Sequence, residues 1–458
     1  MPSIAPEIFK AYDIRGVVGK SLTPDACELI GRAIGTEARA LQCTRLAIGR
    51  DGRLSGPELA RAVARGLQAS GVDVIDIGRV ATPMLYFATY HLATGSGVML
   101  TGSHNPPDYN GLKIMLAEET LAGEAIQKLK YRIESGDFMS GAGGYSQTDI
   151  SRAYLDRITS DIKLRRPLSI VVDCGNGVAG AYAPELYRRL GCRVRELFYE
   201  VNGRFPNHHP NPSQPENLID LIAALGDGDE ELGLAFDGDG DRLGVVTKAG
   251  KIVYPDRQLM LFAADVLTRN PGARIIFDVK STRNLFPWIR SHGGEPLLWK
   301  TGHSLIKAKM KSTGALLAGE MSGHIFFKER WYGFDDGMYA GARLLEYLSG
   351  VRESDAEFAK LPDSVNTPEL QIKLQEGENY ALIAKLQKTA RFDHAREIID
   401  VDGLRVEYAD GFGLARASNT TPVVVLRFEG DDAKALKRIQ DDFRRVLGPE
   451  LPGVALPF

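Results

Sequence analysis

The chain repeats one pattern of expected strands and helices three times, and this repeat limits the folds that it can adopt. Each copy has an apolar strand followed by a loop with an aspartate, a helical stretch, a second strand introduced by glycine, and a third strand that ends in a polar loop. The first strands span residues 46–49, 170–172 and 275–277. Strands that alternate with helices predict parallel sheets with right-handed crossovers. We therefore expect three similar α/β domains with parallel or mixed sheets.

The third strands of the three copies end in loops of different chemistry. The serine loop, residues 101–106, has the sequence Thr-Gly-Ser-His-Asn-Pro. The aspartate loop, residues 237–242, is Asp-Gly-Asp-Gly-Asp-Arg, and the glutamate loop, residues 319–324, is Gly-Glu-Met-Ser-Gly-His. In parallel sheets the loops after the carboxyl ends of the strands form the ligand crevice. We expect these loops at equivalent places in the three domains.

The last hundred residues depart from the repeat. Segments 404–408 and 423–428 are expected as antiparallel strands around a glycine turn at 411–413, followed by a helix at about 431–447. This pattern predicts a smaller α+β domain, and residues 362–368 have the composition of a linker. The expected domains are residues 1–148, 149–251, 252–364 and 365–458.

Length and composition narrow the class of protein further. A chain of 458 residues is too long for one hydrophobic core. A net charge of -3 argues against binding to nucleic acid or to a membrane surface. The four cysteines form no Cys-x-x-Cys pair, which favours a reducing cytosol over a disulfide framework. We find no signal peptide and no apolar run of the roughly 20 residues that a membrane span needs, so we expect a cytoplasmic protein.

The aspartate loop offers three carboxylates, Asp237, Asp239 and Asp241, separated by single glycines. Alternate positions let all three carboxylates fold around one hard cation, and Mg²⁺ suits oxygen ligands of this kind. An acidic turn in solvent is the alternative. A calcium EF-hand loop is a poor match, because Arg242 stands at its sixth position and Lys248 at its twelfth.

The serine loop places Ser103 in a turn, where its hydroxyl could accept and return a phosphoryl group beside a metal and cations. The alternative is a turn serine that caps the next helix. A hydrolase elbow is excluded, since Thr101 and Asn105 stand where glycines are needed. A triad-type hydrogen bond between Ser103 and the adjacent His104 is not implied. His104 or Lys113 could instead move the proton of a substrate hydroxyl or balance charge.

Other polar residues could serve an anion. Arg15 could stabilise charge on a transferring group, although a lone arginine is usually a surface cation. In the arginine loop, residues 416–422, an arginine, short polar side chains and backbone N–H groups could form an anion nest or simply a polar hairpin. Four more polar residues lie at strand ends of the third repeat and could hold substrate hydroxyls or a phosphate, each with a structural alternative: Lys280, His303, Glu320 and Ser322.

One motif favours a different function. Residues 175–180 match Gly-x-Gly-x-x-Gly after an expected strand, and Glu196 lies where a dinucleotide-binding fold has its ribose carboxylate. Asp173 argues against this function, because its negative charge would lie close to a bound pyrophosphate. A nucleotide-dependent oxidoreductase stays open as an alternative, and a tight strand-to-helix turn is the simpler explanation of the glycines.

The four loops together resemble those of the α-D-phosphohexomutase superfamily, and within it the bacterial phosphomannomutase/phosphoglucomutase group. The resemblance covers essentially the whole chain and rests on residues 101–106, 237–242, 319–324 and 416–420, in the order of the family. It implies a heart-shaped enzyme with four domains around a central cleft. It also implies an isomerase that interconverts the 1-phosphates and 6-phosphates of mannose and glucose, since the glutamate loop is similar to that of dual-specificity members.

The resemblance implies roles for named residues. Ser103 would be the phosphoserine, and with its phosphate it would bind Mg²⁺ together with Asp237, Asp239 and Asp241. The groups around the transferring phosphoryl group would be Arg15, Arg242, His104 and Lys113, with His324 as a proton shuttle. Sugar hydroxyls would be held by Glu320 and Ser322, and the second phosphate by Arg416, Ser418, Asn419 and Thr420. The remaining substrate contacts would be Tyr12, Lys280 and His303.

The implied mechanism passes through a hexose 1,6-bisphosphate. Phosphorylated Ser103 donates its group to the free hydroxyl of the sugar phosphate, the bisphosphate turns end for end, and its other phosphate returns to Ser103. One serine and one metal serve both ends of the sugar, so the distal anchor must accept either phosphate. Because water must be excluded, we expect the last domain to close over the ligand. We expect a monomer, and a phosphatase with the same serine and metal is the alternative function.

Overall fold

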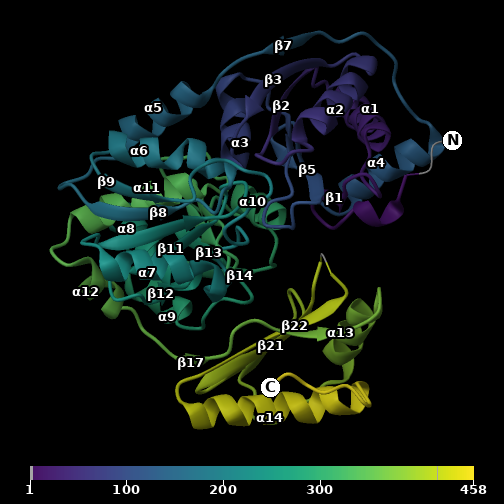
Figure 1. The fold of residues 1–458 in the computed structure, drawn as a ribbon. Helices are drawn as coiled ribbons and strands as arrows, with labels where there is room; N and C mark the ends of the chain where they lie inside the picture. The colour runs from purple at the N-terminus through teal and green to yellow at the C-terminus, as the bar shows by residue number, and fades with distance from the viewer. Residues whose placement is uncertain (1–3, 420) are drawn as a thin grey trace.

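The computed structural model of the protein describes residues 4–419 and 421–458, which form four β-sheets with helices between their strands (Figure 1). The first sheet has seven strands in the order β1-β5-β4-β2-β3-β7, with β6 paired to β5. Its strands are β1 (Ile14–Val17), β2 (Arg45–Arg50), β3 (Asp73–Arg79), β4 (Gly97–Leu100), β5 (Tyr109–Leu116), β6 (Glu119–Thr120) and β7 (Tyr145–Gln147). The α-helices of this segment are α1 (Pro24–Ala40), α2 (Gly56–Ala69), α3 (Thr82–His91) and α4 (Glu124–Ser135).

The second and third sheets have the orders β12-β11-β10-β8-β9 and β14-β13-β15-β16. The elements of the second segment are α5 (Ser151–Asp161), β8 (Ser169–Asp173), α6 (Ala183–Arg189), β9 (Arg193–Leu197), α7 (Ile219–Asp227), β10 (Leu232–Phe236), β11 (Leu243–Thr247) and β12 (Ile252–Val253). The elements of the third are α8 (Pro255–Arg269), β13 (Arg274–Asp278), α9 (Leu285–Ser291), β14 (Glu295–Trp299), α10 (His303–Thr313), β15 (Leu317–Gly319), β16 (Ile325–Phe327), α11 (Gly337–Ser349) and α12 (Ser354–Ala359).

The first three sheets share one strand order, which confirms the repeat. In each sheet the first strand of the repeat lies between the third and the second and runs parallel to both, giving β4-β2-β3, β10-β8-β9 and β15-β13-β14. One further strand pairs antiparallel with the third strand of each repeat, namely β5, β11 or β16. The serine, aspartate and glutamate loops are therefore the turns of three equivalent hairpins, so the sheets are mixed.

The C-terminal sheet is antiparallel, as the sequence predicts, with the order β17-β22-β21-β20-β19 and β18 paired to β22. Its elements are β17 (Val365–Asn366), β18 (Leu370–Lys373), α13 (Glu378–Thr389), β19 (Glu397–Ile399), β20 (Leu404–Tyr408), β21 (Gly411–Ala417), β22 (Val423–Gly430) and α14 (Ala433–Leu447). Asp432 caps α14 by accepting a hydrogen bond from Ala435 N at 2.7 Å, which explains why this helix begins near the expected position.

One expectation for this region is wrong in detail, and the structure adds a detail to a second. The glycine turn expected at 411–413 lies inside β21, because these glycines make room for close packing: a Cβ on Gly411 would lie 2.1 Å from Glu429 O, and one on Gly413 would lie 2.4 Å from the Phe443 ring. The linker expected at 362–368 contains β17, which pairs antiparallel with the end of β22. The linker is therefore partly held by the C-terminal sheet.

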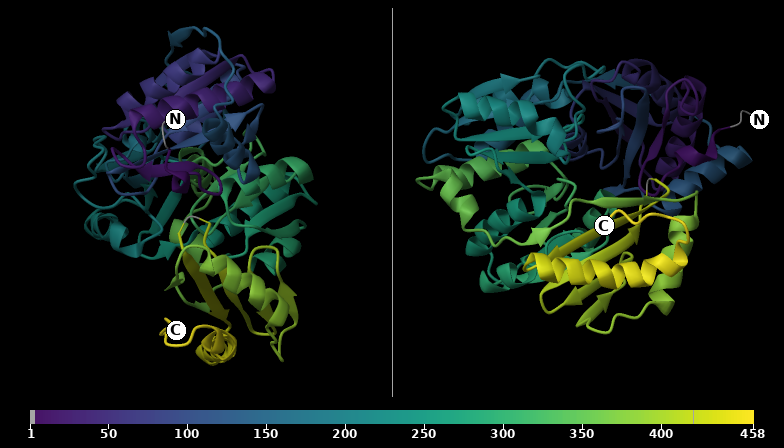
Figure 2. Two further views of the ribbon diagram at one scale, coloured as in Figure 1. Left: turned by 90° about the vertical axis from the view of Figure 1, so that its right-hand side faces the viewer. Right: turned by 60° about the horizontal axis from the view of Figure 1, so that its bottom comes forward.

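Buried apolar side chains show how the four segments are joined. One cluster contains residues of α3, of the second sheet and of the third sheet, whereas the C-terminal sheet and α14 have a cluster of their own. A small cluster that includes Val279, Phe412 and Leu414 joins the third segment to the C-terminal one. Figure 2 shows the C-terminal segment as a separate lobe beside the third segment. Within the described residues, no helix combines the length and apolar character that a bilayer crossing requires.

Candidate active site

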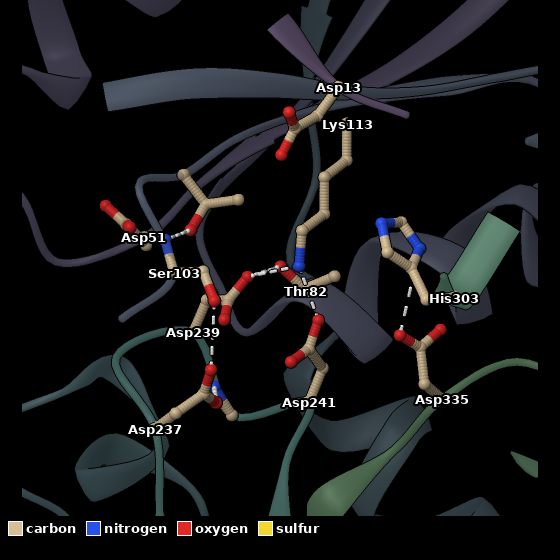
Figure 3. Close-up of polar contacts among 12 residues, drawn as sticks. Asp13, Asp51, Thr82, Ser103, Lys113, Asp237, Asp239, Asp241, His303 and Asp335 are labelled. Atoms are coloured by element: carbon tan, nitrogen blue, oxygen red, sulfur yellow. Dashed lines mark hydrogen bonds and ion pairs between the residues drawn. The ribbon is translucent and has the colours of Figure 1, made fainter. Parts of the chain in front are cut away.

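The three loops at the equivalent hairpins meet at one buried site. Ser103 Oγ of the serine loop lies 3.0 Å from Asp237 Oδ2 of the aspartate loop (Figure 3). His324 Nδ1 of the glutamate loop lies 3.5 Å from Asp241 Oδ1, and Arg242 and His324 form an isolated β-bridge. The aspartate loop therefore contacts both of the other loops.

The aspartate triplet, Asp237, Asp239 and Asp241, is buried, and one oxygen of each residue lies within 4.8 Å of the others. Lys113 of β5 donates from Nζ to Asp239 Oδ2 at 2.8 Å and also pairs with Asp241 (Figure 3). Thr82, at the start of α3, donates from Oγ1 to Asp239 Oδ2 at 2.5 Å. Two groups from the first segment thus bind the carboxylates of the second.

The charges of this cluster are unbalanced, because three carboxylates face two cations, Lys113 and Arg242, whose Nε lies 3.7 Å from Asp237 Oδ2. Burial raises the pKa of Asp237 well above its usual range, and the charges of Asp239 and Asp241 raise it further. Burial would also raise the pKa of Asp239, but Lys113 and the hydrogen bonds of its carboxylate, including that from Thr82, together make the net shift downward. For Lys113, burial acts to lower the pKa, but Asp239 and Asp241 outweigh it and hold the pKa well above its usual range. A divalent cation would neutralise the remaining negative charge.

The triplet fits a hard cation such as Mg²⁺, which prefers oxygen ligands. In the described part of the chain, Asp239 Oδ1 and Asp241 Oδ1 are buried without a hydrogen-bond partner. Buried polar atoms without a partner are uncommon in folded proteins, so these two oxygens are suited to act as ligands. The hydroxyl of Ser103 belongs to the same cluster through its contact with Asp237.

The structure corrects one sequence-based interpretation of the serine loop. Ser103 Oγ lies 3.1 Å from His104 Nδ1, although no such contact was implied by the adjacent positions. Ser103 has a left-handed backbone with φ 48°, and this turn lets the two neighbouring side chains approach. Burial, followed by the positive charges of Arg242 and Arg15, holds the pKa of His104 well below its usual range, so the ring is neutral near pH 7.

Two arginines from different segments flank the serine. Arg15 lies on β1 and donates from Nη1 to Asn105 Oδ1 of the serine loop at 2.6 Å. Arg242 lies at the end of the aspartate loop and donates from Nε to His324 Nε2 at 3.1 Å. The structure therefore brings Arg15, Arg242 and His324 to the site where the sequence expects them.

Asp335 is a site residue that the sequence analysis missed. Its Oδ2 lies 2.9 Å from His324 Nδ1 and 4.0 Å from His303 Nδ1, and its Oδ1 accepts from Lys307 Nζ at 2.9 Å. His324 Nε2 accepts a hydrogen bond from Arg242 Nε, so the other ring nitrogen, Nδ1, is the one that lies beside the carboxylates of Asp335 and Asp241. Burial, followed by Lys307, lowers the pKa of His303 well below its usual range. Asp335 belongs to none of the four loops, so no sequence pattern pointed to it.

The remaining expected residues of the third segment lie near the site. Glu320 accepts a hydrogen bond from Gly302 N, and burial raises the pKa of its carboxyl. Lys280 donates from Nζ to Glu369 Oε2 at 2.9 Å. Burial acts to lower the pKa of Lys280, but Glu369 and Asp278 together raise it above its usual range. Ser322 is half-buried, and the described residues give its side chain no hydrogen bond.

The arginine loop is tied to the third segment through one carboxylate. Arg416 donates from Nε to Asp402 Oδ2 at 3.0 Å, and the same oxygen accepts from Thr301 N at 3.0 Å. Burial acts to lower the pKa of Arg416, but Asp402, Tyr12 and Asp278 together raise it above its usual range. Asp402 therefore orients the arginine.

The first segment reaches the arginine loop through Tyr12. Burial raises the pKa of Tyr12 to about 12, while the charge of Arg416 and a hydrogen bond with Asn419 act in the opposite direction. Ser418 Oγ lies 3.1 Å from Thr421 Oγ1. Thr420, also expected in this loop, lies outside the described residues.

The glycine motif at residues 175–180 has a structural explanation. A Cβ on Gly177 would lie 2.9 Å from Asp237 O, and one on Gly180 would lie 1.9 Å from Tyr199 O. These glycines let the segment pack directly against backbone, including that of the aspartate loop. The geometry favours the tight-turn interpretation over a nucleotide site.

The aspartates that recur after the first strand of each repeat include two that hold the loops of the site. Asp51 Oδ2 accepts a hydrogen bond from Gly102 N of the serine loop at 3.2 Å. Asp278 Oδ1 accepts from Met321 N of the glutamate loop at 3.1 Å. Both contacts join the loop after the first strand to the loop after the third. Their recurrence in the repeat is the sequence signal for this role.

A serine hydroxyl buried beside three carboxylates and flanked by cations is the arrangement of an enzyme that transfers phosphoryl groups. Family models support this class: those for phosphoglucomutase/phosphomannomutase alpha/beta/alpha domains I, II and III match residues 6–140, 152–250 and 254–364, and the model for the C-terminal domain matches residues 369–446. The chain belongs to the phosphoglucomutase/phosphomannomutase family, as the sequence resemblance indicates.

Relatives match over nearly the full chain. The phosphoglucomutase of Neisseria gonorrhoeae is 62% identical over 450 residues, which are 98% of each chain. The phosphomannomutase/phosphoglucomutase of Pseudomonas aeruginosa is 57% identical over 100% of this chain and 99% of its own. A crystal structure of a phosphoglucomutase/phosphomannomutase family protein from Burkholderia thailandensis, 59% identical, covers 100% of both chains with a TM-score of 0.96.

Proposed function

We propose that the chain is an isomerase that interconverts hexose 1-phosphates and hexose 6-phosphates, with mannose and glucose as the sugars. The phosphoryl group passes through Ser103, and a hexose 1,6-bisphosphate is the intermediate that reorients in the site. The observation that carries this proposal is the contact between Ser103 Oγ and Asp237 Oδ2 at 3.0 Å, beside Lys113. The names of relatives at 57% and 62% identity support the same activity.

The chain's own residues account for each part of the transfer. The bond between Ser103 Oγ and phosphorus breaks, a bond between the sugar oxygen and phosphorus forms, and the proton of the sugar hydroxyl passes to a base. His324 is the candidate base: its Nδ1 lies 2.9 Å from Asp335 Oδ2, and its Nε2, which accepts from Arg242 Nε in this structure, would exchange that bond for the sugar hydroxyl. In the second half of the cycle, the other phosphate of the bisphosphate passes back to Ser103, and the base returns the proton to the sugar oxygen. Arg15, Arg242 and Lys113 orient the transferring group and neutralise its charge, and the uncharged ring of His104 orients it.

The aspartate triplet would hold Mg²⁺ together with the phosphate of Ser103. When bound there, the metal supplies positive charge to the phosphoryl oxygens. Glu320 and Ser322 are placed to hold sugar hydroxyls, with Tyr12, Lys280 and His303 as further contacts. The arginine loop, with Arg416, Ser418, Asn419 and Thr420, would hold the phosphate that is not transferred.

The activity can be tested with glucose 1-phosphate or mannose 1-phosphate and a trace of glucose 1,6-bisphosphate. We expect the corresponding 6-phosphate, measured by phosphorus NMR, and no accumulation of inorganic phosphate. Release of inorganic phosphate without an isomer would instead identify a phosphatase. Equal turnover without any phosphorylation of Ser103 would contradict the proposed route.

Removal of divalent metal should abolish turnover. The triplet carries excess negative charge when no cation is bound, so the phosphoryl donor would be repelled. We expect activity to fall to background after chelation with EDTA and to return in full when Mg²⁺ is added in excess, measured by the same NMR assay. Undiminished activity in the chelated enzyme, with metal content verified by elemental analysis, would contradict the assignment of the triplet.

Substitution of Arg416 should affect binding more than chemistry. Its guanidinium is held by Asp402 at 3.0 Å, and a charge-assisted bond to the distal phosphate contributes mainly to binding of the substrate. For Arg416→Ala we expect KM for glucose 1-phosphate to rise by about tenfold or more, with a smaller change in kcat. The exposed Arg391 provides the control, since Arg391→Ala should leave both constants unchanged. An unchanged KM in Arg416→Ala would show that the distal anchor lies elsewhere.

A further inference from the structure

The backbone of Ser103 has a conformation that requires support. Its φ of 48° lies in the left-handed region, which a residue with a Cβ adopts only at a cost. Such conformations persist where the surroundings fix them, and they cluster at functional sites. The serine loop must therefore be held by contacts outside its own turn.

Arg53 supplies these contacts from the loop between β2 and α2. Its side chain is fully buried, and its guanidinium donates four hydrogen bonds to main-chain carbonyl oxygens of the loop and of the residues after it. Nη2 bonds Ser103 O at 2.9 Å and Asn105 O at 2.6 Å, and Nη1 bonds Pro106 O at 2.5 Å and Tyr109 O at 2.8 Å. A planar guanidinium can bind four oxygens in a fixed arrangement, which the single ammonium of lysine cannot do.

Asp51 completes the attachment on the other side of Ser103. Its carboxylate lies 3.3 Å from Arg53 Nε and accepts from Arg53 N at 2.9 Å. It also accepts from Gly102 N at 3.2 Å. The main chain just before Ser103 is therefore bonded to Asp51, and the main chain at and after Ser103 is bonded to Arg53. A Cβ on Gly102 would lie 2.4 Å from Arg53 Cζ, which explains why glycine precedes the serine.

Residues of the second segment pack against Arg53 and shield it from solvent. The ring of Phe205 lies with its centroid 5.2 Å from the guanidinium of Arg53, and a Cβ on Gly203 would lie 2.7 Å from Arg53 Cα. A guanidinium shielded from water binds its carbonyl partners more strongly than an exposed one. The arrangement is thus fixed by two segments of the chain.

Because the carbonyl oxygen of Ser103 points toward Arg53, the orientation of the next N–H group, that of His104, is also fixed. In a trans peptide the C=O and the N–H point to opposite sides, so the N–H of His104 points away from Arg53. Among residues 4–419 and 421–458 no acceptor is found for this N–H. An N–H group beside a residue in the left-handed region is suited to bind an anion, and the oxygens of a phosphoryl group on Ser103 are the anion nearest to it in sequence.

We propose that Arg53 is a positioning residue for phosphoryl transfer, which holds Ser103 in its left-handed conformation by binding four main-chain carbonyl oxygens. Asp51 neutralises it and orients it. This inference rests on the proposed function, since it concerns the same serine. Arg53 touches neither the phosphoryl group nor the sugar, and its role is to fix the hydroxyl and the adjoining N–H.

The test measures how fast Ser103 becomes phosphorylated after mixing with glucose 1,6-bisphosphate, by quenched intact-mass spectrometry. For Arg53→Lys, which keeps the charge, we expect this rate to fall by about 100-fold. KM for glucose 1-phosphate should stay within about twofold, because the distal anchor is untouched. For Arg53→Ala we expect a similar loss and partial recovery on addition of guanidinium ion at concentrations below those that unfold the protein.

Arg343 provides a matched control, because it is equally buried in α11 but makes its contacts with Asp265 and Glu329. Guanidinium ion should not speed the phosphorylation of Arg343→Ala. Thermal unfolding shows whether each variant is folded. If both Arg53 variants are unfolded, Phe205→Leu tests the same support from the second segment, with a several-fold slower phosphorylation and an unchanged KM expected.

The outcomes separate this inference from the proposed function. If the wild-type protein never carries phosphate on Ser103, the proposed function fails. If the wild-type protein is phosphorylated and folded Arg53→Lys reacts at the same rate, only the role of Arg53 is overturned. The role of Arg53 is also overturned by a folded Arg53 variant in which KM rises by the same factor as the phosphorylation rate falls, and which guanidinium ion does not rescue.

Discussion

Ser103→Ala should lose nearly all mutase activity while it keeps its fold. The hydroxyl is the group that would carry the phosphoryl group between the two ends of the sugar, and neither His104 nor the aspartate triplet can replace it at the same position. We expect kcat to fall by about 10⁴-fold or more. The fold should persist because the loop is fixed through its backbone by Arg53 and Asp51 rather than through the hydroxyl.

Intact-mass spectrometry gives the second readout for this variant. After incubation with glucose 1,6-bisphosphate, the wild-type protein should gain the mass of one phosphoryl group and Ser103→Ala should gain none. Ser135→Ala, at an exposed position in α4, serves as the control and should behave as wild type. Near-normal turnover in Ser103→Ala would remove this residue as the carrier.

Lys113→Met should lower both stability and activity by a large amount. Lys113 is buried against Asp239 and Asp241, and removal of one partner of a buried ion pair leaves the remaining charges without compensation. We expect the free energy of unfolding of the metal-free protein to fall by about 3–5 kcal/mol, measured by denaturant titration. Mg²⁺ should restore part of this loss, because it supplies positive charge to the same carboxylates.

The pH dependence of the stabilisation by Lys113 follows from the direction in which its pKa is shifted. The folded protein raises the pKa of Lys113, so the stabilisation is fully present below the usual pKa of lysine in the unfolded chain. It is lost only as the pH rises through the higher pKa of the folded state. The difference between wild type and Lys113→Met should therefore persist from about pH 6 to pH 9 and grow with pH, because the buried carboxylates left without Lys113 destabilise the variant as they ionise. Lys300→Met, at an exposed position, should leave stability unchanged, and an equally small effect in Lys113→Met would contradict the buried pair.

The sequence predicts the repeat, the antiparallel C-terminal sheet and the loops of the site, because each is encoded by a local pattern. Alternation of apolar strands with helices determines the order of elements, and the polar residues after each third strand mark the hairpins. Asp237, Asp239 and Asp241 come together because they are near neighbours in one loop. Their closeness to Ser103 follows from the packing of two repeats, and the family resemblance rather than the spacing indicated it.

The features that the sequence did not predict depend on contacts between distant segments. The contact of Ser103 with His104 requires a left-handed turn that is held by Arg53, and Asp335 reaches His324 from a loop without a repeated pattern. The glycines at 411 and 413 indicate a turn when read locally, but they serve the packing of β21 against β22 and α14. Closure of the last domain over the ligand, the monomeric state and the cytoplasmic location stay predictions.

The equivalent hairpins have a consequence for how such an enzyme can diversify. Each of the three loops is bounded on both sides by paired strands, so its register is fixed by the sheet and is independent of the residues at the tip. A change of side chains within one tip can alter which chemical group is recognised without disturbing the surrounding scaffold. In this way one common scaffold presents a serine at the first tip, three carboxylates at the second and a glutamate at the third.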